Sequence, residues 1–416
     1  MNKHRGALAP LVASGLLAVA LVAGCGSGTS SDKSGGSGAS GSPIKVMTIV
    51  PLSGNGVAYP EEAAAAQASA KYVNANGGVA GHPIDLTVCD DQNNPNGAAA
   101  CGRKAVEEHA VAVVGSFSVY ANEFMTALTA ANIPYLAPCC SFASQELAAP
   151  NSFNTTSGQL IYVGVGIAAG QANGQNGSIV NVQTAGPRTE FLNQLIQAGL
   201  KSTGFTGTYK NVVIPAQATD YAPTVAQITN GSSTIILSIG QLQAKALLPA
   251  LASAGAKQHL IGVAGNSMAT SVVKANPDIT NGATIVDYYP PLGSSDKWKP
   301  FKDAFAKYAS SDQKSLDISN LGSEAEWIGM NILKQVGQGV TGDFTASNLL
   351  AALKKTTSVD TGGVTPPLDF TKPFPDPALA AVYNTSVTFE KVSNGDITWP
   401  DNKFYDAGPP FNQYMK

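Results

Sequence analysis

Short apolar runs alternate with longer helical stretches along most of this chain, and that alternation constrains the fold more than any other feature. The run Ile44–Val50 is rich in β-branched residues and predicts a buried strand. The Ala-rich stretch Glu61–Asn76 carries acidic residues in its first turn and ends at Gly77-Gly78, which predicts a helix. The order recurs through strands at 84–89, 110–115 and 134–137 and helices at 98–108 and 121–131. Strands and helices at this spacing indicate a parallel, doubly wound sheet.

The same rhythm begins again further along, so we expect two α/β units, near 44–150 and 157–284. In the second unit the patterns predict helices at 159–170, 187–200, 221–229 and 244–254 and strands at 178–182, 211–214, 234–239 and 259–263. Helices then dominate 297–355, and late strands follow near 381–392. A chain that builds two lobes and then adds elements must cross between them more than once.

The N-terminus is typical of an export signal followed by a tether. The apolar stretch Leu8–Ala23 follows Lys3 and Arg5, and it is shorter than the roughly 20 residues of a membrane span. It ends in Leu21–Cys25, which resembles the bacterial lipobox; a plain signal peptide with an incidental Cys is the alternative. We therefore expect a lipoprotein signal peptide at 1–24, then lipidated Cys25 and a flexible Gly/Ser tether at 25–42. The protein is then expected to be exported and lipid-anchored to the outer face of the cell membrane.

The composition of the remainder describes a globular protein. Over the full chain 44% of the residues are hydrophobic and 13% are charged, and the length that remains suffices for two cores. Loss of Lys3 and Arg5 with the signal leaves 23 basic against 28 acidic residues, a formal charge of −5. No basic cluster remains, so we expect no nucleic-acid partner.

Four cysteines remain besides Cys25. Cys89 ends a predicted strand and Cys101 lies in the next predicted helix, a separation that suits a local disulfide in an exported protein. Cys139 and Cys140 are adjacent, and either a vicinal disulfide or two separate thiols is compatible with the sequence. No C-x-x-C pair occurs and no His lies near these cysteines in the sequence, so we expect no metal and no cofactor.

Several segments of the first unit carry a resemblance to a known family. They are Ile44–Val46, Pro51–Gly54, the turn Asn74–Gly81, Cys89–Asp91, Val113–Ser116 and Ile133–Tyr135. Together they resemble the branched-chain amino-acid (leucine/isoleucine/valine) binding proteins of ABC transporters, which have the type I periplasmic-binding fold. The resemblance implies two Rossmann-like lobes joined by three hinge crossovers, near Phe153, Asp287 and Tyr383, with one ligand in the cleft.

The resemblance also implies a division of the chain and a function. We expect an N-terminal lobe of 44–152 plus about 288–380 and a C-terminal lobe of 153–287 plus about 381–416. The expected function is that of a monomeric receptor that captures a small organic ligand for an ABC permease and is not an enzyme. A sensor of the same fold that reports to a signalling partner is one alternative, and a secreted α/β hydrolase is another.

Ligands of doubly wound sheets bind beyond the carboxyl ends of the strands, so the loops after the strands supply the candidate residues. In the first lobe the candidates are Tyr59 and Phe117 for aromatic contact, Ser118 and Ser141 for hydroxyl donors, and Cys139 for its carbonyl. In the second lobe they are Gln241 and Asn266 for neutral hydrogen bonds and Arg188 for pairing with an acidic ligand. An ordinary role in a loop or turn is the alternative for these residues.

The sequence departs from the family's pattern in the second lobe. The family holds the amino group of its ligand with an acidic residue, but the matching segment Val263–Asn266 contains no carboxylate. A position that is usually aromatic becomes Arg188. These departures favour an acid, an amide or an apolar small molecule over a free amino acid held in the usual way.

Enzyme motifs are weak. The segment Gly337–Gly342 has the pattern G-x-G-x-x-G but follows a predicted helix, so the dinucleotide-binding context is missing. The segment Gly265–Ala269 lacks one Gly of the nucleophile elbow.

Overall fold

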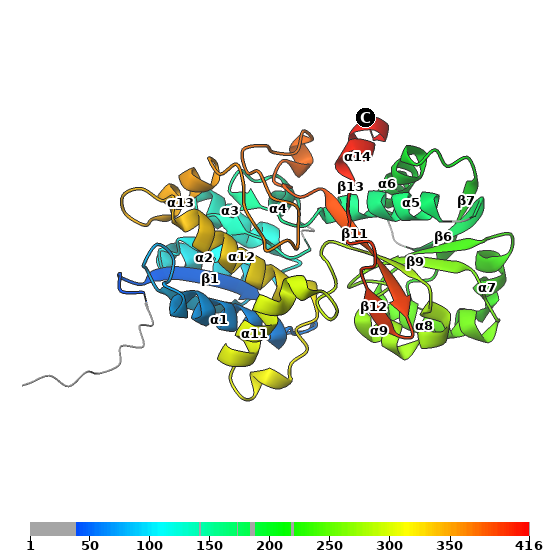
Figure 1. Cartoon of the computed structure of the whole chain (residues 1–416), viewed down its shortest axis with the longest axis horizontal. Helices are drawn as coiled ribbons and strands as arrows, with labels where there is room; N and C mark the ends of the chain where they lie inside the picture. The colour runs from blue at the N-terminus through cyan, green and yellow to red at the C-terminus, as the bar shows by residue number, and fades with distance from the viewer. Residues whose placement is uncertain (1–38, 141–142, 173, 184–187, 218–219, 416) are drawn as a thin grey trace, which may run out of the picture. The chain divides into compact units, whose positions relative to one another are not determined.

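The computed structural model describes residues 39–140, 143–172, 174–183, 188–217 and 220–415. Figure 1 shows these residues as two α/β groups of elements. The signal peptide, Cys25, most of the tether and Ser141 lie outside the described residues. No described helix is both long enough and apolar enough to cross a membrane.

The first sheet of the described chain has five strands. Their order is β2 (Ile84–Asp90), β1 (Ile44–Val50), β3 (Ala112–Val114), β4 (Tyr135–Leu136) and β5 (Ser152–Phe153). All four neighbouring pairs are parallel, as predicted. The sheet includes one strand, β5, that the sequence analysis did not predict.

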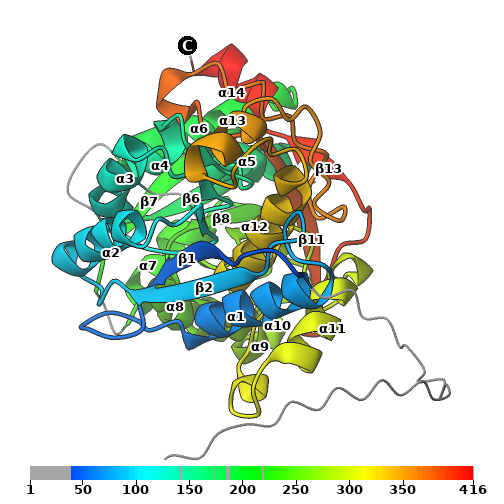
Figure 2. The same cartoon turned by 90° about the vertical axis from the view of Figure 1, so that its left-hand side faces the viewer.

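Alternate residues of β1 face opposite sides of this sheet. Val46 belongs to the same core cluster as Ala64 of α1 (Pro60–Ala75), whereas Met47 packs in a cluster with Ala98 of α2 (Pro95–Glu107). Figure 2 shows α1 and α2 on the two sides of β1 and β2. The remaining early helices are α3 (Ala121–Ala130) and the short α4 (Ser144–Ala148).

Helices from late in the chain also cover the first sheet. These are α11 (Lys299–Tyr308), α12 (Leu321–Gly337) and α13 (Ala346–Leu353). The first two pack against α1, and α12 also contacts β3 and β4 (Figure 1). The motif at Gly337–Gly342 begins on the last residue of α12, so it follows a helix as expected.

The second sheet has eight described strands. Its main path is β12 (Asp396–Thr398), β11 (Ser386–Ser393), β10 (Thr284–Asp287), β9 (His259–Val263), β8 (Thr234–Ser238), β6 (Asn176–Val182) and β7 (Thr208–Ile214), and β13 (Phe404–Asp406) pairs with β11. Strands β6 to β10 pair with one another in parallel, and β11 runs antiparallel to β10. The parallel sheets and mixed α/β order confirm the expected fold class.

Helices of the second group are α5 (Ile161–Gln171), α6 (Arg188–Ser202), α7 (Ala222–Thr229), α8 (Gln241–Ser253), α9 (Thr270–Ala275), α10 (Pro277–Thr280) and α14 (Gly408–Tyr414). Glycines allow α5 and α6 to pack closely. A Cβ atom on Gly166 would lie 2.0 Å from the Ile196 carbonyl oxygen, and one on Gly199 would lie 2.0 Å from the Val163 oxygen.

Three described segments connect the first group of elements to the second. Hydrogen bonds join these segments to one another. The Asn154 N–H donates to the Ala381 carbonyl at 2.9 Å, and the Tyr383 N–H donates to the Asn154 carbonyl at 3.2 Å. The Thr155 and Tyr289 hydroxyls lie 2.7 Å apart. These contacts join the segments after β5, after β10 and before β11.

Candidate ligand-binding site

The second sheet has a point at which its strand order reverses. Strand β6 pairs with β7 on one side and with β8 on the other. The chain continues from β6 to β7 on the first side, whereas it continues from β8 to β9 on the opposite side. In sheets of this type, a crevice forms at the carboxyl ends of two such strands.

A pocket of about 260 Å³ lies at this position. It is lined by Gly158, Gln159, Tyr162, Asn181, Val182, Thr189, Leu192, Ser238, Ile239, Gly240, Asn266 and Tyr288. The volume is near the lower end of the range for small-molecule sites, about 300–1,000 Å³. A larger hollow, of about 550 Å³, lies against α14 and the end of β13, with Asp406, Pro409 and Gln413 in its wall, and it shares no lining residue with the first pocket.

Two adjacent strand residues bring unpaired polar atoms to the first pocket. Asn181 of β6 pairs in register with Ser238 of β8. The Asn181 side-chain nitrogen and the Ser238 hydroxyl oxygen are buried, and neither has a hydrogen-bond partner among the described residues. Asn181 is only 2% exposed. A buried polar group without a partner costs about 1–3 kcal/mol, so these atoms are suited to receiving a ligand.

The other walls of the pocket combine apolar and aromatic surface. Val182, Leu192 and Ile239 are aliphatic, and Tyr162 and Tyr288 are aromatic. The Tyr288 hydroxyl donates to the Gly158 carbonyl at 3.1 Å. Burial raises the pKa of Tyr288, so the hydroxyl remains protonated. Among the described residues that line the pocket, none is charged.

The predicted residues of the second lobe have different positions. Asn266 lines the pocket. Gln241 begins α8 and its amide donates to the Gly265 carbonyl at 2.9 Å, and it is not among the residues that line the pocket. Arg188 begins α6, but its side chain lies outside the described part of the chain. Sequence analysis missed Asn181 and Ser238, because it considered the loops and not the residues near the carboxyl ends of the strands.

In the first lobe, Tyr59 and Phe117 come together from the loops after β1 and β3. Their ring centroids are 5.2 Å apart and the rings meet edge to face. Both side chains are partly exposed. Burial raises the pKa of Tyr59, and Glu62 and Glu61 add to the increase, so its hydroxyl is a neutral donor.

The hydroxyl of Ser118 is engaged within the lobe. It donates to the Asp91 carboxylate and accepts from the Tyr120 N–H at 3.0 Å, and Ser118 is buried. Cys139 is also buried, and its N–H donates to the Ser116 carbonyl at 3.0 Å. The Cys139 sulfur is bonded to that of Cys140, one of the two arrangements that the sequence left open.

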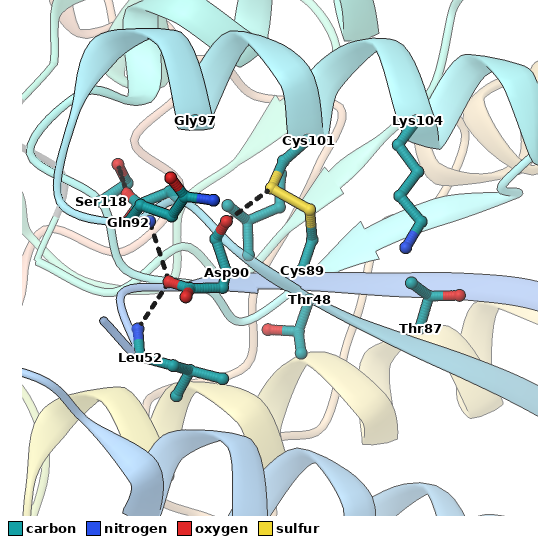
Figure 3. The surroundings of a disulfide bond; sticks show 12 residues. Thr48, Leu52, Thr87, Cys89, Asp90, Gln92, Gly97, Cys101, Lys104 and Ser118 are labelled. Atoms are coloured by element: carbon teal, nitrogen blue, oxygen red, sulfur yellow. Dashed lines mark hydrogen bonds between the residues drawn. A yellow bond between two sulfur atoms is a disulfide. The ribbon is translucent and has the colours of Figure 1, made fainter. Parts of the chain in front are cut away.

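A disulfide joins Cys89 at the end of β2 to Cys101 on α2 (Figure 3). Asp90, which follows Cys89, accepts the Leu52 N–H at 2.9 Å and the Gln92 N–H at 2.8 Å. The bond therefore fixes α2 to a strand end that also holds the loop after β1.

Two buried acids lie beneath the strand ends of the first lobe, and sequence analysis did not single them out. Glu326 of α12 accepts from the Thr48 hydroxyl and from the Ser116 N–H, the latter at 2.9 Å. Burial raises its pKa to about 8, against the opposing effect of these two hydrogen bonds. Burial and the nearby Glu326 carboxyl also raise the pKa of Glu62 well above its ordinary value. Glu326 lies between Ala325 and Trp327 in α12, and this position between apolar neighbours is the signal that could have revealed it.

A family model described as periplasmic binding protein matches residues 43–379. The chain belongs to the periplasmic binding protein family. Proteins of this family act outside the cytoplasm and bind solutes, which agrees with the resemblance found in the sequence. No curated protein sequence matches the chain.

Solved structures share the fold at low sequence identity. A fatty acid ABC transporter substrate-binding protein from Thermomonospora curvata is 17% identical, with a TM-score of 0.68 over 92% of this chain and 97% of that one. A solute-binding protein from Rhodopseudomonas palustris BisB5, in complex with 3,4-dihydroxybenzoic acid, is 17% identical, with a TM-score of 0.66 over 89% and 99%. A branched-chain amino acid transporter protein from Streptococcus pneumoniae, in complex with isoleucine, is 17% identical, with a TM-score of 0.63 over 85% and 97%.

Proposed function

We propose that this protein is the extracytoplasmic solute-binding receptor of an ABC importer and not an enzyme. The observation that carries the proposal is the pocket at the carboxyl ends of β6 and β8, where Asn181 and Ser238 present unpaired polar atoms. The match to the periplasmic binding protein family over most of the chain supports it. A pocket with neutral hydrogen-bonding groups and no described charged residue is suited to holding a solute.

The ligand is a small organic molecule: an amino acid, an amide, or a small carboxylic or aromatic acid. Proteins of the same fold bind ligands of this range, since one holds isoleucine and another holds 3,4-dihydroxybenzoic acid. Tyr59 and Phe117 supply aromatic surface from the first lobe, and Asn266 contributes to the second-lobe pocket.

Capture occurs by hinge closure of two lobes, 44–152 with about 288–380 and 153–287 with about 381–416. The ligand favours the closed state because it contacts both lobes only there. The bonded segments at Asn154, Tyr289 and Tyr383 are the proposed hinge. The closed receptor then docks, as a monomer, on a permease of the cytoplasmic membrane.

A lipid on Cys25 anchors the receptor to the outer face of the membrane, and the Gly/Ser tether lets the folded part reorient. Replacing Cys25 with Ala in the producing cell should move the protein from the membrane fraction to the soluble fraction. Incorporation of labelled palmitate into the wild type and not into Cys25→Ala would support the anchor. Equal incorporation into both would contradict it.

A thermal-shift screen of the purified protein tests the receptor function. The panel holds amino acids, their amides, short carboxylic acids and aromatic acids. A ligand at 100 times its Kd adds about 2.7 kcal/mol of stability, which raises Tm measurably. A specific, saturable shift with at least one class supports the proposal. No shift with any class, together with labelling by a serine- or cysteine-directed hydrolase probe, would contradict it.

A further inference from the structure

We propose that Asn181 and Ser238 set the specificity of the pocket, and that they select an uncharged oxygen-bearing group in place of an ammonium group. The inference rests on the proposed receptor function and narrows its class of ligand. The favoured group is a hydroxyl, a carbonyl or a carboxamide, carried on an apolar or aromatic body.

The two side chains form one hydrogen-bonding site. Asn181 and Ser238 are register partners on neighbouring parallel strands, so both are at the same end of the sheet. Both line the pocket, and both have a buried polar atom without a partner among the described residues. A ligand oxygen that bonds to this hydrogen-bonding site removes the free-energy cost of leaving two buried polar atoms without hydrogen bonds.

This hydrogen-bonding site is neutral and can both donate and accept hydrogen bonds. An amide offers a carbonyl oxygen and an NH₂ group, and a half-turn about its terminal bond exchanges the two. The serine hydroxyl rotates to donate or accept as its partner requires. Asn181 and Ser238 can therefore both bond to one neutral oxygen group of the ligand.

Among the described residues of the pocket wall, an ammonium group finds no counter-ion. Burying an ammonium without an anionic partner is far more costly than burying a neutral polar group. No Asp or Glu is among the described residues that line the pocket. Asp287 precedes Tyr288 of the pocket wall, but its carboxyl accepts the Tyr288 N–H at 2.6 Å and does not line the pocket. Burial also raises the pKa of Asp287, which favours its neutral form.

The rest of the lining selects the body of the ligand. Val182, Leu192 and Ile239 form aliphatic wall, while Tyr162 and Tyr288 offer ring surface. A pocket of about 260 Å³ holds one small ring or a short branched chain together with its polar group.

Two matched series test the inference by calorimetric titration of the purified protein. One compares tyrosine, 3-(4-hydroxyphenyl)propanoate and 3-phenylpropanoate, and the other compares leucine with 4-methylpentanoate. In the series that binds, we expect loss of the amino group to tighten binding by at least about 10-fold. We expect loss of the ring hydroxyl to weaken it about 3- to 10-fold, the value of one neutral hydrogen bond.

Substitutions test whether these two side chains cause the ligand preference. Asn181→Ala and Ser238→Ala should each weaken the preferred ligand about 3- to 10-fold. Asn181→Asp places an anion at the same site and should shift the preference toward the amino acid. Asn193→Ala is the matched control, because Asn193 is also buried with an unpaired oxygen but does not line the pocket.

The outcomes separate the two proposals. If an amino acid binds as tightly as its counterpart without the amino group, the inference fails while the receptor function stands. Wild-type affinity in both Asn181→Asp and Ser238→Ala also overturns the inference, even if Asn181→Ala does not fold. If no member of either series binds and the wider screen also finds no ligand, the receptor function fails, and the inference fails with it.

Discussion

Glu326 is fully buried in the first lobe and has its pKa raised to about 8 by burial. In the unfolded chain a glutamate titrates near 4.5, so between about pH 4.5 and 8 the folded state binds the proton and the unfolded state does not. Stability falls with rising pH wherever the folded state binds more protons. The stabilising contribution of this group is therefore complete below about pH 4.5 and is lost as the pH rises through about 8.

Glu326→Gln should flatten this pH dependence. The variant keeps an oxygen that can accept from Thr48 and Ser116 but has no proton to lose. Between pH 5 and 8, the wild type should lose a few kcal/mol relative to the variant, since each unit of pKa shift corresponds to about 1.4 kcal/mol. Urea denaturation at several pH values measures the difference. Glu107→Gln, at an exposed position of α2, is the control and should follow the wild type. Parallel slopes for Glu326→Gln and the wild type would contradict the assignment.

The sequence predicted some site residues and not others, for physical reasons. Asn266, which was expected because it follows a strand in a loop, where ligand contacts concentrate, lines the pocket. Asn181 and Ser238 lie at the ends of strands, and their importance depends on a register between β6 and β8 that no local pattern reveals. Ser118 was expected to donate to a ligand, but in the structure its hydroxyl donates to Asp91, which lies on another loop and could not be paired with it from the sequence.

At the scale of elements, the crossing of α5 and α6 depends on two glycines. Alanine favours a helix over glycine by about 1 kcal/mol, so propensity alone would make Gly166→Ala stabilising. The added Cβ would instead lie 2.0 Å from the Ile196 carbonyl oxygen, which is backbone and cannot rotate away. Gly166→Ala should therefore destabilise the protein by about 1–3 kcal/mol.

The midpoint of urea denaturation measures this effect, with Gln194→Ala on the exposed face of α6 as a control for helix propensity. The control should be neutral or slightly stabilising. A Gly166→Ala protein more stable than the wild type would show that the helices can separate at no cost.

The disulfide between Cys89 and Cys101 links a strand to its following helix across a separation of 12 residues. Closing a loop of this length stabilises a protein by about 3 kcal/mol through the unfolded state. The double variant Cys89→Ala/Cys101→Ala should lose about 2–4 kcal/mol, measured by denaturation without reductant. A reductant should lower the wild-type stability more than that of the double variant. An unchanged denaturation midpoint in the double variant would show that the bond contributes nothing to stability.

Elements with strong local patterns were predicted well, and some short ones were missed. Strand β9 has the predicted bounds, His259–Val263, because its apolar run is bounded by polar turns. Strand β5 is two residues long and β10 is four, and each exists because a neighbouring strand offers it hydrogen bonds. Such elements arise from tertiary pairing, so periodicity in one segment cannot reveal them.

At the scale of the whole molecule, the chain passes between the two sheets through segments that bond to one another. Asn154 pairs with Ala381 and Tyr383, and the Thr155 hydroxyl meets that of Tyr289. The Asn384 amide also donates to the Thr155 carbonyl at 2.8 Å. Side-by-side connections of this kind restrict the relative motion of two lobes to a bend, which is the motion that a ligand-capturing receptor needs.

Small-angle X-ray scattering of the purified protein, with and without a ligand found by the thermal-shift screen, tests the central claim most directly. If the ligand is captured by hinge closure, its addition at saturation decreases the radius of gyration, while a compound that gave no thermal shift leaves it unchanged. The same radius of gyration with and without saturating ligand would contradict a receptor that works by closing two lobes.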